Sequence, residues 1–138
     1  MFLFLRLFAI ICVAVGLLHL SLGLHADNLL GADLGLEVIS NATLDSQNRF
    51  YGAAFMLFGV VTWICVADLK QNAQLFRMML LVFFTGGVAR LISAIIYGLP
   101  APLVQILAIS ELLIPPFLLW WHSTWLRKQA ALDESHMT

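Results

Sequence analysis

Four long apolar runs, separated by more polar segments, dominate the hydrophobic pattern of the chain. They extend over residues 2–24, 50–67, 78–99 and 102–121. A hydrocarbon core about 30 Å thick requires about 20 consecutive apolar residues in an α-helix, and each run is close to that length. The pattern predicts an all-α integral membrane protein, in which residues 1–138 form a single transmembrane domain folded as a four-helix bundle.

The first apolar run begins next to the first residue, where a secretory signal peptide would also begin. Arg6 interrupts the start of the run, and no clear cleavage site follows between Ser21 and Ala26. The run is also longer than the apolar part of a usual signal peptide. We therefore expect a retained membrane helix.

Basic residues in the short connections predict the orientation of the helices. Residues 25–48 contain no Lys or Arg, whereas basic residues lie on the other side of the predicted bundle: Arg6, Lys70, Arg77, Arg127 and Lys128. Because Lys and Arg favour the cytoplasmic side of a membrane, both termini are expected there. Residues 25–49 then form a long outer cap, and residues 122–138 form a polar cytoplasmic tail. The chain is expected to cross the membrane several times.

Composition narrows the classes of function. The chain is 62% hydrophobic and 11% charged, whereas a soluble domain is about one quarter charged. Seven Lys and Arg residues cannot supply the basic stripe of a nucleic-acid-binding protein. The two cysteines, Cys12 and Cys65, lie in different apolar runs and form no C-x-x-C motif. The sequence therefore predicts no nucleic-acid partner, metal site or cofactor.

Three ionisable residues lie inside the apolar runs, namely His19, Arg90 and Glu111. Each such residue costs about 2.5–3.5 kcal/mol on insertion scales, so it requires a partner or an aqueous pocket. Arg90 and Glu111 lie at similar depth, about 13 Å from the outer ends of their runs at a rise of about 1.5 Å per residue. We expect them to form a buried ion pair between neighbouring helices. Small residues at helical spacing predict that Arg90 faces the buried side: Gly86, Ser93 and Ala94.

A second group of polar residues is predicted at the outer mouth. His19 lies in the outer half of the first run, and Asp45, Gln47 and Arg49 immediately precede the second run. Asp45 and Arg49 are four residues apart and can pair on one helical face. Asp45 can also cap the start of that helix. In that case one arginine is left facing the outer mouth, where it could bind an incoming carboxylate or phosphate.

The charged pair has two possible roles at this stage. An Arg and a Glu at matched depth can form a strut that determines which helices are neighbours. Alternatively, the same charges can form part of a ligand site, with His19 titrating near neutral pH. Both interpretations stay open on the sequence.

Several motifs together resemble a known family. They are Gly16-x-x-His19, residues 44–53 followed by Gly59, residues 86–91, Gly98-Leu99-Pro100 and Glu111-Leu112. This set is similar to a small bacterial inner-membrane family catalogued as domain of unknown function 4345, which is itself similar to the DoxX-like four-helix membrane proteins. The resemblance implies four spans and a location in a bacterial inner membrane. It also places the candidate residues on motif positions, with His19 matching less specifically: Asp45, Gln47, Arg49, Tyr51, Arg90 and Glu111.

These observations favour a non-enzymatic membrane protein that binds an acidic amphiphile, either a fatty acid or a phospholipid, in envelope lipid homeostasis. The expected ligand-binding residues are His19, Asp45, Gln47, Arg49, Tyr51, Arg90 and Glu111. Small-residue faces suggest a homo-oligomer. One alternative is a membrane isomerase or oxidoreductase that uses Glu111 and His19 as acid and base. Another is an accessory subunit of a transporter.

Overall fold

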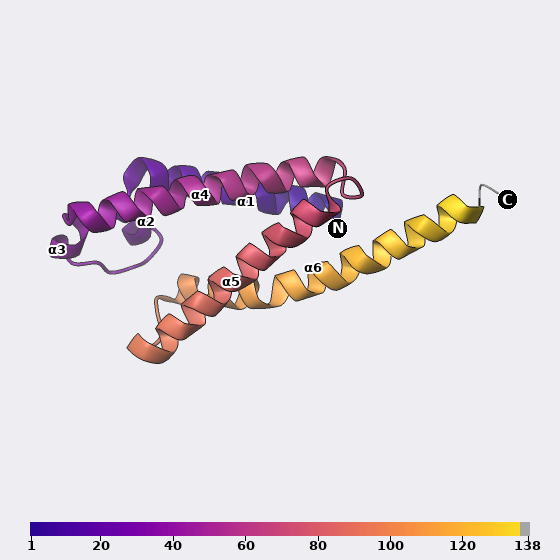
Figure 1. Cartoon of the computed structure of the whole chain (residues 1–138). Helices are drawn as coiled ribbons and strands as arrows, with labels where there is room; N and C mark the ends of the chain where they lie inside the picture. Colours follow the sequence, from indigo (N-terminus) through magenta and orange to yellow (C-terminus); the bar gives the residue numbers. More distant parts are fainter. Residues whose placement is uncertain (136–138) are drawn as a thin grey trace. The chain divides into compact units, whose positions relative to one another are not determined.

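The computed structural model describes residues 1–135, and most of them are helical (Figure 1). The elements are α1 (Phe2–Leu22), α2 (Leu24–Leu29), α3 (Leu36–Ile39), α4 (Ala42–Ala67), α5 (Ala73–Tyr97) and α6 (Pro102–Ser135). No strand occurs in the described residues. The prediction of an all-α protein is confirmed.

Four of these helices are long and apolar enough to cross a membrane. They are α1, α4, α5 and the part of α6 from Pro102 to Leu132. The expected number of spans is therefore found, and the chain has the character of a multi-pass membrane protein.

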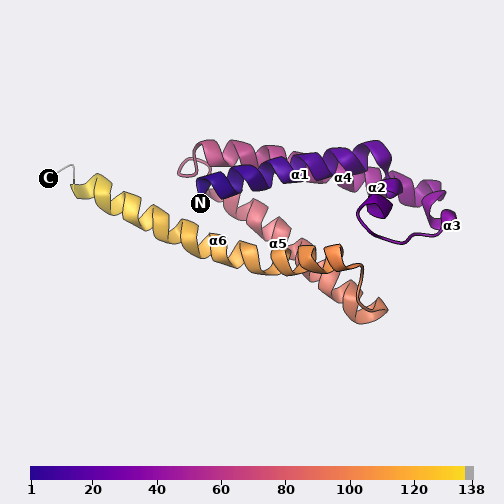
Figure 2. The same cartoon turned by 180° about the vertical axis from the view of Figure 1, so that it is seen from behind.

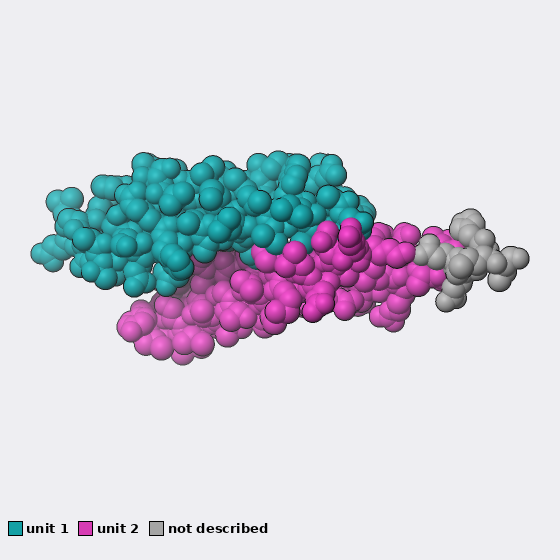
Figure 3. All heavy atoms as spheres, turned by 45° about the horizontal axis from the view of Figure 1, so that its top comes forward, with its two compact units in different colours: residues 1–69, 101–103 teal, residues 70–100, 104–138 magenta. Residues whose placement is uncertain are grey.

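The helices fall into two compact units, coloured separately in Figure 3. Unit 1 contains residues 1–69 and 101–103, and therefore holds α1, α2, α3 and α4. Unit 2 contains residues 70–100 together with the described part of 104–138, which is α5 and nearly all of α6. The four-helix bundle stays a prediction, and each unit is described by itself.

In unit 1, α1 and α4 lie antiparallel and side by side along their length (Figures 1 and 2). Glycines bring the two backbones together. A Cβ atom on Gly52 would lie 2.6 Å from the backbone nitrogen of Leu20, and one on Gly59 would lie 2.6 Å from the carbonyl oxygen of Ala9. Close approach through small residues is a common way for membrane helices to associate, because lipid supplies little hydrophobic drive between them.

Three of the helices extend at one end beyond the apolar runs that predicted them. α4 begins at Ala42, ahead of the run that starts at Phe50, and α5 begins at Ala73, ahead of Met78. α6 continues past Trp121 to Ser135, so most of the expected tail is helical, and residues 136–138 lie outside the described part. Apolar runs mark the length that can lie in lipid, whereas caps and helix-forming polar residues decide where a helix ends.

The expected outer cap over residues 25–49 consists of several elements. It contains most of α2, all of α3 and the first two turns of α4, joined by non-helical residues. Asp45, Gln47 and Arg49 therefore lie on the same continuous helix as Tyr51. Between α3 and α4 lie only Ser40, which ends α3, and Asn41, which precedes α4.

Asn41 is the N-cap of α4, since its Oδ1 accepts hydrogen bonds from the backbone N–H groups of Thr43 and Leu44 at 3.0 and 3.1 Å. We expect Asn41→Ala to lower stability by about 1 kcal/mol, because both donors lose their acceptor. Asn41→Asp keeps a capping oxygen and should stay close to the wild type. Thermal unfolding in one detergent would measure both changes. Equal stability of the alanine variant and the wild type would contradict the role of this cap.

In unit 2, α5 and α6 meet at a glycine in the middle of α5. A Cβ atom on Gly87 would lie 2.9 Å from the Cβ of Glu111 and 3.0 Å from Cγ of Leu112. Nearer the start of α5, the Phe76 ring lies edge-on to the ring of the buried His122, with centroids 5.1 Å apart. The approach at Gly87 places the third and fourth spans close enough for their polar side chains to pair.

Candidate functional site

The end of α1 is shaped by a glycine with a carboxylate beside it. Gly23 ends the helix with a φ of 58°, in the left-handed region that glycine adopts without strain. Asp45 fills the adjacent space, where a Cβ on Gly23 would overlap its carboxylate. Oδ1 of Asp45 accepts a hydrogen bond from the backbone N–H of Leu24, the first residue of α2, at 3.2 Å. The carboxylate therefore joins α4 to the turn between α1 and α2.

Arg49 also stabilises the turn between α1 and α2. Its Nε donates to Oδ2 of Asp45 at 2.7 Å, and its Nη1 donates to the carbonyl oxygens of Leu20 and Ser21 at 2.9 and 2.8 Å. The last carbonyls of a helix lack partners within the helix and carry partial negative charge, so a guanidinium stabilises them. The predicted pairing of Asp45 with Arg49 is confirmed.

The cap predicted for α4 is wrong in one respect. Asn41 caps this helix, and Asp45 instead accepts from the first N–H group of α2. The reason is that Asp45 lies one turn inside α4, where the backbone N–H groups already have helical partners. With Asp45 used as this cap, one arginine was expected to face the outer mouth without a partner. Arg49 is not that arginine, because it makes three hydrogen bonds.

His19 joins a second polar contact in unit 1. Its Nδ1 lies 2.8 Å from the carbonyl oxygen of Val15, and its Nε2 lies 3.4 Å from Oδ1 of Asp27. Asn48 donates from Nδ2 to the other oxygen of Asp27 at 2.6 Å. The carbonyl oxygen of Val15 and Oδ1 of Asp27 are both hydrogen-bond acceptors. Both ring nitrogens of His19 can donate to them only when the imidazole carries two protons.

Sequence reasoning missed Asp27 and Asn48 as members of this contact. The signal for Asn48 was its spacing on α4, since it follows Asp45 by three residues and precedes the buried Gly52 by four. Asp27 carried no comparable signal, because only the turn at Gly23 brings α2 back toward His19.

Gln47 and Tyr51 lie on an exposed part of α4. The Tyr51 hydroxyl donates to Oε1 of Gln47 at 3.4 Å, one helical turn away. Both side chains belong to exposed residues. The structure therefore brings together His19, Asp27, Asn48, Asp45 and Arg49 in unit 1 and places Gln47 and Tyr51 beside them along the helix.

Arg90 and Glu111 form the predicted ion pair in unit 2. Nε of Arg90 donates to both carboxylate oxygens of Glu111, at 3.2 Å to Oε1 and 2.9 Å to Oε2. The two side chains differ in exposure, since Glu111 is 7% exposed and Arg90 is 41% exposed. The carboxylate therefore lies inside the α5–α6 contact, and the guanidinium lies at its edge.

The expectation that Arg90 faces the buried side of its helix is wrong. The buried positions of α5 are Phe76, Leu80, Phe83 and Gly87, and the next turn leaves Arg90 at the border of this stripe. Its long side chain reaches Glu111 through Nε and is 41% exposed as a whole. Among the described residues, every hydrogen bond of Arg90 is made by Nε. Both terminal nitrogens, Nη1 and Nη2, therefore point to no acceptor in that part of the chain.

The described residues contain no group of three or more His, Cys, Asp or Glu side chains that could hold a metal ion. The thiols of Cys12 and Cys65 are buried and free. The candidate site residues therefore supply carboxylates, guanidinium groups, an imidazole, amides and a hydroxyl.

Comparison with protein families identifies the chain. The family described as domain of unknown function, DUF4345, matches residues 2–122. The chain belongs to the DUF4345 family. The matched region contains every candidate residue in both units, from His19 to Glu111. The resemblance predicted from the motifs is thereby confirmed for DUF4345. Comparison with curated proteins and with solved structures gave no match.

Proposed function

We propose that this DUF4345 protein binds the acidic head group of an amphiphile, a fatty acid or a phospholipid, through the guanidinium of Arg90. The observation that carries the proposal is that only one of the three nitrogens of the Arg90 guanidinium is hydrogen-bonded. Nε is held by the buried Glu111, and the two terminal nitrogens make no hydrogen bond within the described residues, on a side chain that is 41% exposed. Such a group is oriented before any ligand arrives.

The chemistry of the terminal nitrogens suits an oxyanion. A guanidinium presents parallel N–H donors that match the two oxygens of a carboxylate or phosphate. An arginine within an apolar helix costs about 2.5–3.5 kcal/mol on insertion scales, and a bound anion would offset part of that cost. Exposed apolar residues follow Arg90 in α5, namely Leu91 and Ile92, so the helix surface around the guanidinium is largely apolar.

Glu111 has a positioning role in this proposal. It accepts two hydrogen bonds from Nε and thereby directs the outer edge of the guanidinium. His19, Asp45 and Arg49 are assigned to the shape of the α1–α2 turn, since each has partners within unit 1. The enzymatic alternative gains no support, because Glu111 is occupied by Arg90 and His19 by Val15 and Asp27.

The setting of the protein is part of the same proposal. The distribution of Lys and Arg favours both termini in the cytoplasm, and the resemblance to an inner-membrane family favours a bacterial inner membrane. A protein that holds acidic amphiphiles there would serve envelope lipid homeostasis. Small residues along the helices favour a homo-oligomer, in which more helix surface is buried.

Binding of oleate tests this function directly. We expect Arg90→Gln to weaken oleate binding by about 10- to 150-fold, because a hydrogen bond to a charged group contributes about 1.5–3 kcal/mol. Arg90→Lys keeps the charge but loses the paired donors, and should fall between. Native mass spectrometry of the purified protein with added oleate would measure the bound fraction.

Arg77→Gln is the matched control, because Arg77 is an exposed arginine near the start of the same helix, α5. It should bind oleate as the wild type does. Circular dichroism would establish that the variants keep the same helix content. Equal oleate binding by Arg90→Gln and Arg77→Gln would overturn the proposed function.

A further inference from the structure

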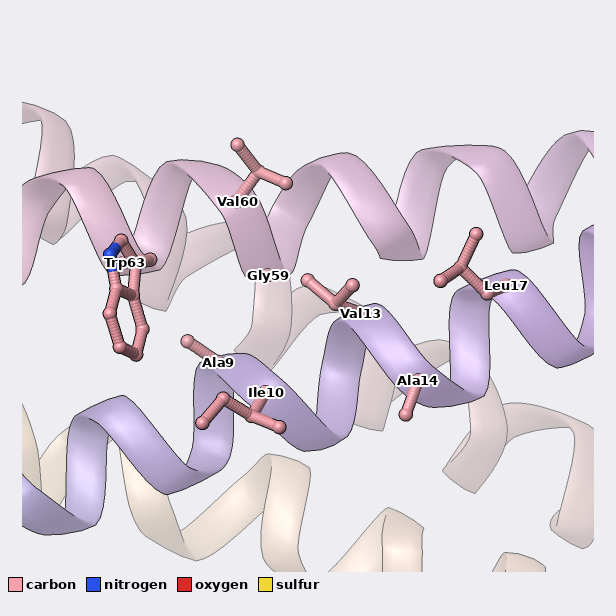
Figure 4. Close-up of a pocket in the computed structure, with 8 residues that line it drawn as sticks. All are labelled: Ala9, Ile10, Val13, Ala14, Leu17, Gly59, Val60 and Trp63. Atoms are coloured by element: carbon pink, nitrogen blue, oxygen red, sulfur yellow. The ribbon is translucent and has the colours of Figure 1, made fainter.

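A long apolar groove runs between α1 and α4 in unit 1 (Figure 4). Its volume is about 410 Å³, within the range of about 300–1,000 Å³ that ligand pockets occupy. One wall is the face of α1 from Ala9 to Leu17, and the other is formed by Gly59, Val60 and Trp63 of α4. We call this feature the α1–α4 groove.

A short side chain opens the groove on α1. Ala14 lies between the larger residues Ile10 and Leu17, whereas Ala9 and Gly59 border the groove where the two helices approach most closely. Trp63 extends from α4 toward α1 and borders the space (Figure 4). Ile10, Leu17 and Trp63 line the groove yet are about half exposed, so the groove is open along its side. Its surface chemistry suits a hydrocarbon chain and offers nothing to a polar ligand.

A cation lies at one end of the groove. Arg6 precedes Ala9 and Ile10 by three and four residues, so it continues the same face of α1. Its Cζ atom lies 5.7 Å from the centre of the Trp63 ring, which borders the groove. Among the described residues this ring is the only partner of the Arg6 side chain, and no carboxylate forms a salt bridge with it there.

We propose that the α1–α4 groove holds one acyl chain of an anionic phospholipid, with the lipid phosphate bound by Arg6. Charge complementarity selects this occupant, since an unneutralised guanidinium adjoins an apolar channel. Arg6 is about 6 Å inside the start of α1 at a rise of about 1.5 Å per residue, so its long side chain can reach the head-group region. The wall from Ala9 to Leu17 covers about 12 Å of hydrocarbon on the same scale. The open side lets the second acyl chain stay in the bilayer.

This site differs from the one proposed at Arg90. It uses a different cation and a different pair of helices, and neither proposal depends on the other. It also gives Trp63 a defined place, beside both the guanidinium and the acyl chain.

Trp63 supplies a local probe of the groove. In a full-length variant with Trp120, Trp121 and Trp125 replaced by Phe, all tryptophan fluorescence comes from Trp63. Reconstitution into nanodiscs with brominated-chain phosphatidylglycerol or brominated-chain phosphatidylcholine at equal content would report which lipid occupies the groove. We expect phosphatidylglycerol to quench Trp63 at least twofold more than phosphatidylcholine. Arg6→Gln should remove this excess.

Filling the groove is the second arm. Ala14→Phe should reduce quenching by both lipids, because the ring would occupy the space of the acyl chain. Ala54→Phe is the matched control, since Ala54 is an exposed alanine of α4 outside the groove, and it should leave the quenching unchanged. Arg90→Gln should also leave it unchanged, whatever its effect on oleate binding.

Three results would overturn the proposal. Equal quenching by the two lipids would show that the groove meets only bulk acyl chains. Absence of quenching by both would show that a protein segment, of this chain or of a second copy, covers it. Arg6-dependent quenching by brominated oleate, without a preference for phosphatidylglycerol, would show that the occupant is a fatty acid.

Discussion

Replacing Gly16 by alanine should destabilise the protein, although alanine is the better helix former. A Cβ atom at this position would overlap the backbone nitrogen of Met56 and lie 2.7 Å from the carbonyl oxygen of Gly52. These are backbone atoms, which cannot rotate away as a side chain can. α1 and α4 would have to separate. Overpacking of this kind costs about 1–3 kcal/mol, and the gain in helix propensity of about 1 kcal/mol would not offset a cost in the upper part of that range.

Gly86→Ala is the matched control in α5. A Cβ atom there would lie 3.8 Å from Oε2 of Glu111, which is ordinary van der Waals contact. Only the helix propensity then changes, so this variant should be more stable than the wild type by up to about 1 kcal/mol. Thermal unfolding of both variants in the same detergent would reveal opposite signs. A stabilising effect of Gly16→Ala would contradict the close contact of α1 with α4.

The spans were predictable because a membrane imposes a length on them. About 20 apolar residues are needed in each helix, and this requirement is visible in residues 2–24 and in the other runs. Helix ends were less predictable, because they depend on single hydrogen bonds. The start of α4 at Ala42 rests on the side chain of Asn41, and no change in hydrophobicity marks that residue.

The candidate pairs were predictable where helix geometry alone brings them together. Asp45 and Arg49 are one turn apart, and Arg90 and Glu111 lie at similar distances from one tight connection. Contacts that require a turn were not predictable. The carbonyls of Leu20 and Ser21 are backbone groups, so no residue type marks them as acceptors for Arg49.

The exposure of Arg90 was also hidden from the sequence. The small residues that were used to predict the buried face, Gly86, Ser93 and Ala94, are not buried themselves, whereas Gly87 is. An arginine is also long enough to begin near a buried face and end outside it. The position of a guanidinium is therefore decided by its partner, here the buried carboxylate of Glu111. The difference in exposure between Arg90 and Glu111 therefore affects stability as well as binding.

Arg90→Leu should lower the free energy of unfolding by about 3 kcal/mol. Removing one partner of a buried ion pair costs about 3–5 kcal/mol, because the other charge is left without compensation. The lower value applies since Arg90 is 41% exposed, whereas the carboxylate left behind is 7% exposed. The double variant Arg90→Leu with Glu111→Leu should regain most of this loss, because apolar side chains of similar volume can replace an ion pair without a net cost.

Oleate binding by the same variants separates a strut from a ligand site. If Arg90 and Glu111 served only to hold α5 against α6, the double variant would recover its stability and bind oleate as the wild type does. The proposed function requires the opposite for binding, because leucine cannot donate to a carboxylate. We therefore expect the double variant to be nearly as stable as the wild type and to bind oleate as weakly as Arg90→Gln. Denaturant unfolding and native mass spectrometry on one preparation would measure the two properties, and recovery of oleate binding along with stability would leave the pair with a structural role alone.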